Sequence, residues 1–404
     1  MKKALLFLLI LTSAAFGFTG CGANNTPQES SSGSGALRSM PPYEISFTDK
    51  LCKQMPQDTN YMFSPLSVKT ALALAANGAS GKTQKEILDV LGISDLQQFN
   101  EHSKKLTDVY SSSEVLKISS ANSIWINKDN FSSDFSDDYK KNAGNFYNAS
   151  AETVDGKNAV SRINKWVAEK TNNKIKSIVS EPDFSTVLLN AVYFKGSWRN
   201  EFPEKATAKD DFTDRNGNKS KIDFMNRTGD TAYINLNGIT AVKLPYKSTS
   251  VDYDGAEPDS IDVNMYLLMS DGEINSDTFI RQNKNNFKDV NMKLSLPKFE
   301  LEYSAVLNEA LQKLGIKTAF TDGAQFQGMF RDGNTFIDKV IHKTYVRLTE
   351  KDTEAAAVTA IVTKLSLEIP AETVTVKFDK PFKFVIRDDS NEEILFMGEY
   401  AFAG

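Results

Sequence analysis

Apolar residues in the early part of the chain follow the spacing of helices. Residues 65–76 (PLSVKTALALAA) are apolar nearly throughout, which predicts a buried helix, and Ser64 is placed to cap its first turn. Residues 83–91 (TQKEILDVL) open with the threonine and glutamate of a capping box, which predicts a second helix that starts there. Residues 163–178 repeat large apolar side chains at helical spacing, which predicts a third, amphipathic helix.

Strand patterns dominate the second half of the chain. Residues 187–194 (VLLNAVYF) form a continuous apolar run, typical of a strand buried on both faces. Residues 263–269, 290–296 and 374–386 continue the strand pattern, and the last of these alternates between apolar and polar positions. Helices early and strands late predict an α+β fold. No repeat and no linker interrupts residues 43–404, which we expect to form one domain.

The first 42 residues have a different character. Residues 1–20 combine a basic start with an apolar run, the pattern of a signal peptide. Residues 18–21 (FTGC) resemble the lipobox of bacterial lipoproteins, in which Cys21 is lipidated; the alternative is an ordinary secretory peptide with an incidental cysteine. Residues 21–42 are rich in Ser, Gly and Pro, which predicts a flexible tether. We expect a lipoprotein anchored at the bacterial cell surface, touching the membrane only through its lipid.

The composition removes several classes of function. With 47 Lys and Arg against 52 Asp and Glu, the formal net charge is −5, so we expect no nucleic-acid partner. Two histidines and two cysteines, far apart in the sequence, are a poor basis for a zinc site or a disulfide scaffold. Phosphate-binding glycine motifs and a hydrolase nucleophile elbow do not occur. We therefore expect no metal, no cofactor and no enzymatic activity.

Two histidines and two segments of the chain are interpreted from their local sequence. His102 lies in a polar helical stretch, where we expect a solvent-facing side chain, whereas His342 lies in a strand pattern and is expected to be buried and hydrogen-bonded. Residues 251–260 (VDYDGAEPDS) fit an exposed insertion better than a calcium loop. Residues 350–360 (EKDTEAAAVTA) form either a helix, which their composition favours, or a strand small enough to slip between other strands.

Several motifs, in order and at characteristic spacing, resemble those of the serpins from about residue 47 to residue 402. The motifs before residues 350–360 are Asn60 with residues 63–67 (FSPLS), 189–198 (LNAVYFKGSW), 296–299 (LPKF) and 311–315 (LQKLG). The motifs after these residues are 378–382 (FDKPF) and 395–398 (LFMG). Between them, the serpin hinge is matched by Glu350, Thr353, Glu354, Ala355, Ala356, Ala357 and Thr359.

The resemblance implies a fold and a mechanism. The fold has three β-sheets, about eight or nine helices and an exposed reactive loop, here about residues 350–370. A target protease cleaves this loop and forms an acyl-enzyme, and the cleaved loop then inserts into the main sheet of a metastable native state. The implied function is suicide inhibition of extracellular serine proteases, with cysteine proteases as a second class. The alternative is a non-inhibitory surface lipoprotein of the same fold.

Alternation places Thr353, Ala355, Ala357 and Thr359 on one face of an inserted strand, where small uncharged side chains favour fast insertion. Asp352 stands where the family usually has glycine, which matters only if that position needs unusual backbone angles.

The resemblance also implies roles for buried residues. Those matching the serpin sheet-opening switch are Ser64, Ser67, Asn190, His342 and Trp198. Since buried polar groups need partners, exchanging these partners allows a sheet to open between two packed states.

The reactive bond has several candidates. Counting along the family's loop places it between Ser366 and Leu367, with Lys364 and Leu365 as alternatives. Lys364 suits trypsin-like proteases, Leu365 suits chymotrypsin- or subtilisin-like ones, and Ser366 suits elastase-like ones. We favour Leu365 or Ser366, and we expect the inhibitor to be a monomer whose partners are such proteases.

Overall fold

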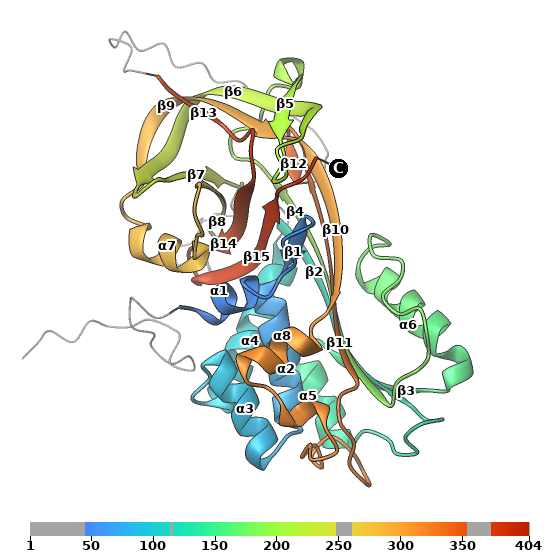
Figure 1. Cartoon of the computed structure of the whole chain (residues 1–404). Helices are drawn as coiled ribbons and strands as arrows, with labels where there is room; N and C mark the ends of the chain where they lie inside the picture. Colours follow the sequence, from blue (N-terminus) through green and yellow to red (C-terminus); the bar gives the residue numbers. More distant parts are fainter. Residues whose placement is uncertain (1–44, 114–115, 248–260, 354–372, 404) are drawn as a thin grey trace, which may run out of the picture. The chain divides into compact units, whose positions relative to one another are not determined.

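A computed structural model describes residues 45–113, 116–247, 261–353 and 373–403 (Figure 1). The described residues contain eight α-helices: α1 (Phe47–Cys52), α2 (Pro65–Asn77), α3 (Gly81–Leu91), α4 (Leu96–Ser112), α5 (Asp137–Tyr147), α6 (Gly156–Lys170), α7 (Ser276–Asn283) and α8 (Asn308–Leu314). Two short 3-10 turns lie at Glu204–Ala206 and Thr318–Phe320. None of the helices in these ranges is both long and apolar enough to cross a membrane.

A six-stranded sheet runs in the order β10-β11-β4-β2-β3, and a two-residue strand, β12, pairs with β4. Its strands are β2 (Leu116–Asn127), β3 (Ser150–Val154), β4 (Thr186–Ser197), β10 (Phe299–Val306), β11 (Lys339–Leu348) and β12 (Asp352–Thr353). Helices α2 and α4 pack on one face of this sheet, and α6 lies on the opposite face (Figure 1). The sheet is therefore covered on both sides.

A second, nine-stranded network runs in the order β1-β15-β14-β8-β7-β6-β9-β13, with β5 on β6. Its strands are β1 (Tyr61–Phe63), β5 (Ala208–Thr213), β6 (Lys219–Leu236), β7 (Ile239–Pro245), β8 (Val263–Met269), β9 (Lys288–Pro297), β13 (Val374–Lys377), β14 (Phe382–Asp388) and β15 (Glu393–Tyr400). The first half of β6 pairs with β5 and its last residues pair with β7. Two of the three expected sheets are thus joined by hydrogen bonds through this one long strand.

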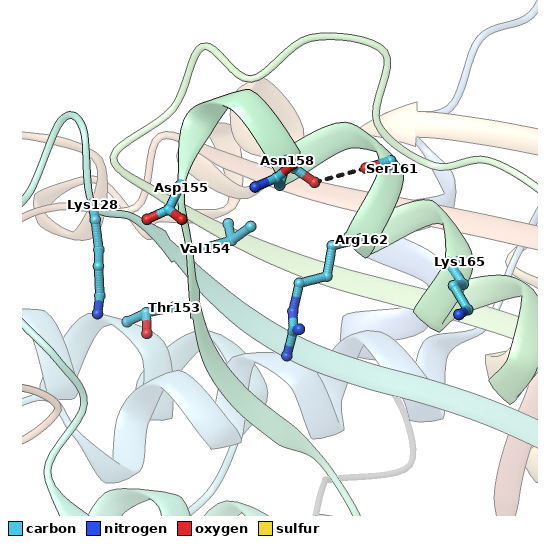
Figure 2. A pocket seen from close by; sticks show the side chains of 8 residues that line it. All are labelled: Lys128, Thr153, Val154, Asp155, Asn158, Ser161, Arg162 and Lys165. Carbon is cyan, nitrogen blue, oxygen red and sulfur yellow. Dashed lines mark hydrogen bonds between the residues drawn. The ribbon is translucent and has the colours of Figure 1, made fainter.

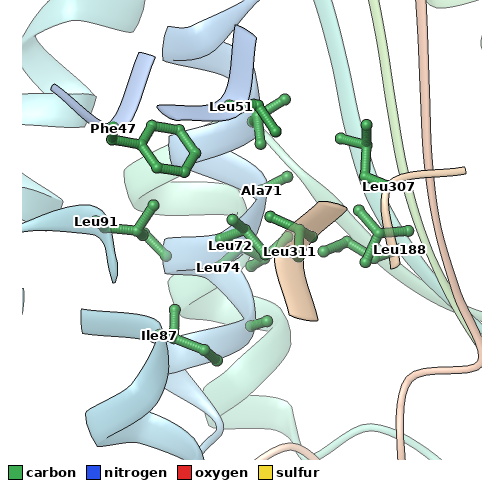
Figure 3. Packing of buried hydrophobic residues seen from close by; sticks show 14 of the residues in the cluster. Phe47, Leu51, Ala71, Leu72, Leu74, Ile87, Leu91, Leu188, Leu307 and Leu311 are labelled. Carbon is green, nitrogen blue, oxygen red and sulfur yellow. The ribbon is translucent and has the colours of Figure 1, made fainter. Parts of the chain in front are cut away.

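Helix α2, which is apolar on nearly all sides, lies in the hydrophobic core beneath the six-stranded sheet. Leu72 and Leu74 of α2 lie against Leu188 of β4 and Leu311 of α8 (Figure 3). The predicted cap is present, because the Ser64 hydroxyl accepts a hydrogen bond from the Ser67 amide at 3.3 Å. Burying such a helix on all sides fits its lack of a polar face.

Two helix predictions are wrong at their boundaries. Helix α3 begins at Gly81, after Ser80, so Thr83 is not its cap; the Thr83 hydroxyl instead accepts a hydrogen bond from the Gln325 amide. The helix predicted over 163–178 ends at Lys170, because Asn172 and Asn173 have φ angles of 50° and 59°. Asparagine adopts this left-handed conformation more readily than most residues, and it ends a helix.

Gly398 of β15 provides a test of close packing. A Cβ atom there would lie 2.5 Å from both the Tyr61 carbonyl oxygen and the Phe384 ring. We expect Gly398→Ala to destabilise the native state by about 1–3 kcal/mol, as overpacking does, measured from urea denaturation midpoints. The matched control is Gly144→Ala on the open side of α5, where no atom lies within 4 Å; it should be neutral or stabilise by about 0.5–1 kcal/mol. Equal effects of the two substitutions would contradict this packing.

Candidate functional site

The hinge meets the six-stranded sheet at one end of the parallel pairing between β4 and β11, which we call the seam. Strands β4 and β11 pair in parallel over seven residue pairs, and the ladder ends at Tyr193 and Tyr345. Beyond that point Gly196 of β4 pairs with Leu116 of β2 on one edge and with Thr353 of β12 on the other. Strand β12 therefore occupies the same edge of β4 as β11 does, at the mouth of the seam.

Trp198 holds the backbone that leads into β12. Its indole Nε1 donates to the Thr349 carbonyl oxygen at 2.9 Å, and its amide donates to the Lys351 carbonyl oxygen at 3.0 Å. The ring is buried and stacks on Tyr246 at 4.5 Å between centroids. A large side chain packed in this way fixes the start of the hinge against the end of β4.

Glu350 adds an ionic anchor at the same place. Its carboxylate accepts hydrogen bonds from Lys298 Nζ at 2.9 Å and from the Thr207 hydroxyl at 2.8 Å. Its carbonyl oxygen accepts from the Phe202 amide at 2.8 Å. Burial raises the pKa of the Glu350 carboxyl, but the hydrogen bonds from Lys298 and Thr207 outweigh burial and hold that pKa below its usual value.

Three buried polar side chains form a row across the sheet. His342 of β11 lies beside Asn190 of β4, which in turn lies beside Asn122 of β2. His342 Nδ1 is 2.5 Å from Asn190 Oδ1, and the Asn190 side-chain amide donates to Asn122 Oδ1. The row crosses the parallel seam between His342 and Asn190, so separating the two strands breaks that contact.

Both ends of the row return to the first turn of α2. The Ser64 amide donates to His342 Nε2 at 2.9 Å. At the other end, the Asn122 side-chain amide donates to the Ser120 hydroxyl at 3.3 Å. The Ser120 hydroxyl in turn lies 3.2 Å from the Ser67 hydroxyl. The hydrogen bonds thus connect three strands to one helix end.

The contacts of His342 determine its protonation. Because Nε2 accepts a hydrogen bond from the Ser64 amide, the ring proton lies on Nδ1, which donates to Asn190 Oδ1. Burial lowers the pKa of His342 from 6.5 to about 3, since the charged imidazolium would be desolvated. His342 is therefore neutral at physiological pH and lies in the sheet as a buried, hydrogen-bonded group, as the sequence predicted.

The structure brings Ser64, Ser67, Asn190 and His342 into one network and places Trp198 at the top of the seam. Sequence reasoning missed Asn122 and Ser120, because their role follows from the pairing register of β2 with β4. The remaining predicted positions lie outside the described residues: Cys21, Glu354, Ala355, Ala356, Ala357, Thr359, Lys364, Leu365, Ser366, Leu367 and residues 251–260.

The prediction for His102 is wrong. Its side chain is only 14% exposed, and its Nε2 lies 3.4 Å from the buried Glu393 carboxylate. Strand β15 carries Glu393 against α4, a contact between residues almost 300 positions apart that no helical pattern indicates.

A surface pocket of about 530 Å³ lies at the start of α6, away from this network (Figure 2). It is lined by Lys128, Thr153, Val154, Asp155, Asn158, Ser161, Arg162 and Lys165. Arg162 donates to Glu152 at 2.6 Å, and Lys165 lies 3.9 Å from Glu169. Because these two cations already have acidic neighbours, the pocket presents mixed charge and points to no particular ligand.

The His342 environment predicts a dependence of stability on pH. The folded-state pKa lies below the unfolded value, so this contribution is complete above pH 6.5 and is lost as the pH falls from there toward 3. Between pH 7 and pH 5 we expect protonation of His342 to lower the free energy of unfolding by about 2 kcal/mol, measured from urea denaturation midpoints. His342→Gln should abolish this component of the pH slope. His102→Gln, which changes the other histidine, should retain it; a His342→Gln slope equal to that of the unchanged protein would contradict the assignment.

Comparison with known proteins agrees with this geometry. The family model described as "Serpin (serine protease inhibitor)" matches residues 43–401. Human neuroserpin is 32% identical over 364 residues, which cover 85% of this chain and 86% of neuroserpin. Iripin-1 of Ixodes ricinus is 31% identical over 362 residues, covering 85% and 89% of the two chains.

Solved structures show the same fold. The thermophilic serpin tengpin, solved in its native state, is 30% identical with a TM-score of 0.76, and the match covers 89% of this chain and 93% of tengpin. Human thyroxine-binding globulin, solved in a complex with thyroxine, is 21% identical with a TM-score of 0.77; the match covers 89% of this chain and 96% of the globulin, and it is a likeness of fold alone. From the matched residues, these relatives and the arrangement of the sheets, the chain belongs to the serpin family.

Proposed function

We propose that this protein is a suicide-substrate inhibitor of extracellular proteases. Its reactive loop, about residues 350–370, is cleaved, forms an acyl-enzyme with the protease and inserts into the six-stranded sheet between β4 and β11. The observation that supports this most directly is β12, which runs antiparallel to β4 at the mouth of the seam. A strand that continued β12 in its own direction would run down β4, between β4 and β11.

The register of β12 defines which face of such a strand would be buried. Thr353 pairs with Gly196, so continued pairing brings Ala355 opposite Phe194 and Ala357 opposite Val192. Opposite residues in an antiparallel pair point to the same face, and Phe194 and Val192 belong to the interior cluster. The interior face of the inserted strand would therefore carry small uncharged side chains, which pass into a packed sheet with little clash.

The same register brings Thr359 opposite Asn190. An inserted strand at that level separates Asn190 from His342 and removes their hydrogen bond. A threonine there offers a hydroxyl that both donates and accepts, so the buried amide and imidazole gain a new partner in place of each other. We assign to these residues, with Ser64 and Ser67, the role of the sheet-opening switch.

Insertion is favourable because it exchanges one parallel ladder for two antiparallel ladders. The present ladder of seven pairs is lost, and a central strand gains partners on both edges. Each additional hydrogen bond contributes about 1 kcal/mol net, so a full strand adds on the order of 10 kcal/mol. That equals the stability of an ordinary domain, so a kinetic barrier must hold the uncleaved form.

Asp352 does not oppose this function. It lies in β12 and pairs with Ser197, so its backbone is extended, a conformation that any residue adopts. The glycine usual at this position in the family is therefore not required for backbone freedom here.

The competing function is that of a non-inhibitory binding protein, since thyroxine-binding globulin has the same fold and was solved in a complex with thyroxine. The small, uncharged side chains on the interior face of the hinge favour inhibition. We assign the reactive bond to residues 364–367, with elastase-like, chymotrypsin-like, subtilisin-like or trypsin-like targets, and we assign a bacterial surface location through lipid on Cys21.

The test of inhibition uses residues 22–404 and one protease of each class. We expect at least one protease to give a band, stable to denaturant, at the summed mass of inhibitor and protease. The mass of the released C-terminal peptide identifies the cleaved bond. Thr353→Arg places a charge on the buried face, so it should still be cleaved while the covalent band disappears.

The matched control for that substitution is Glu354→Arg, which carries the same side chain on the opposite face of the inserted strand. It should retain most of the covalent band. Cleavage of the unchanged protein without any such band would move it to the non-inhibitory class. Undiminished complex formation by Thr353→Arg would contradict insertion.

Lipid attachment has an equally direct test. In a bacterial host fed radiolabelled palmitate, the unchanged protein should carry label and sediment with membranes. Cys21→Ala should lose both properties. Cys52→Ala removes the other cysteine of the chain and should leave both intact; unlabelled wild-type protein in the medium would instead indicate an ordinary secreted protein.

A further inference from the structure

A strap crosses the outer face of the seam. We use this name for residues 171–179, which follow α6. Asn172 and Asn173, with φ angles of 50° and 59°, turn the chain out of the helix. Ile175 and Val179 anchor the strap in the apolar cluster between α6 and the sheet.

Hydrogen bonds hold the strap to α6 and to the sheet. The Asn164 side chain, from α6, donates to the Val179 carbonyl oxygen at 2.8 Å and accepts from the Val179 amide at 3.1 Å. From β11, Lys343 Nζ donates to the Ser177 carbonyl oxygen at 2.9 Å. The strap is therefore a defined part of the fold rather than a loose connection.

Lys174 of the strap bridges the two strands of the seam. Its Nζ lies 5.8 Å from the ring centroid of Tyr193 on β4 and 5.8 Å from that of Tyr345 on β11. The two tyrosines are directly paired across the seam, with centroids 6.0 Å apart. One cation thus lies within cation–π range of both strands that must separate.

The electrostatics of Tyr345 favour this contact. Its hydroxyl donates to Glu300 Oε1 at 2.8 Å, and burial together with that carboxylate raises the pKa of Tyr345 to about 12. Tyr345 therefore stays a neutral phenol at physiological pH. A phenol that donates to an anion has a more electron-rich ring, and the attraction for a cation depends on that charge.

Insertion of a strand is incompatible with the bridge. Neighbouring strands lie about 4.8 Å apart, so a strand between β4 and β11 moves Tyr193 and Tyr345 to about 9.6 Å apart. By the register of β12, the residue that enters between the rings is Ala356. Lys174 can then contact one ring at most.

We propose that Lys174 is a latch that closes the seam from outside, holding Tyr193 and Tyr345 together and slowing loop insertion. This proposal rests on the proposed function, because it regulates the same opening. The latch stabilises the closed sheet and is already lost when the strands part, so it raises the barrier. It lengthens the life of the uncleaved inhibitor and limits how fast a cleaved loop inserts.

The experiment follows the full chain without protease at raised temperature. The measurement is the rate at which intact native protein converts to a loop-inserted form that resists unfolding by concentrated urea. Lys174→Met keeps the apolar stem and removes the charge, and we expect conversion about tenfold faster, equal to about 1.4 kcal/mol. Lys174→Arg keeps a cation over the rings and should convert within about twofold of the unchanged protein.

A double-mutant cycle separates the latch from a general loss of stability. Tyr345→Leu should also accelerate conversion, and adding it to Lys174→Met should give little further increase, because both remove one interaction. Equal conversion rates for Lys174→Met, Lys174→Arg and the unchanged protein would overturn the latch, and so would fully additive effects in the cycle.

Failure of the underlying function gives a different result. If the unchanged protein gains no urea resistance even after a protease has cut its loop, then insertion does not occur, and the proposed function and the latch are both overturned. If the cut protein does gain resistance, insertion is established, and the rates of the Lys174 variants then test the latch alone.

Discussion

The parallel pairing of β4 with β11 is the constraint on which the rest of this structure depends. Each of the two strands is antiparallel to its outer neighbour, β2 or β10, and parallel to the other. A strand entering between them from β12 would be antiparallel to both and would gain hydrogen bonds on two edges. The closed sheet therefore contains a seam at which an added strand would give more hydrogen bonds than the present pairing. The contacts around the seam determine how readily β4 and β11 separate.

Two sets of contacts cross the seam from opposite faces. On the interior face, the His342–Asn190 hydrogen bond is part of a network that begins and ends on the first turn of α2. On the outer face, Lys174 lies over Tyr193 and Tyr345. In the proposed insertion, the interior contact exchanges one polar partner for another, whereas the outer contact loses at least one of its two rings, so the two faces act on the opening in different ways.

The base of the hinge is held firmly at the end of the seam. Trp198 and Glu350 fix residues 349–351 through backbone hydrogen bonds and an ion pair. A fixed base makes β12 the point about which the following chain can turn into the sheet. The register at this point, Thr353 opposite Gly196, relates each later hinge residue to a position on β4.

The sequence alone determined the α+β class, the buried helix α2 with its Ser64 cap, the strand cores, the family and the burial of His342. These follow from local periodicity and from motifs whose order survives in one dimension. It did not reveal the end of α6 at Lys170, the contact of His102 with Glu393, or the parts played by Asn122, Ser120 and Lys174. Only the tertiary structure decided these, because they depend on strand register and on which residues distant in the chain meet across a sheet, and no local pattern carries that information.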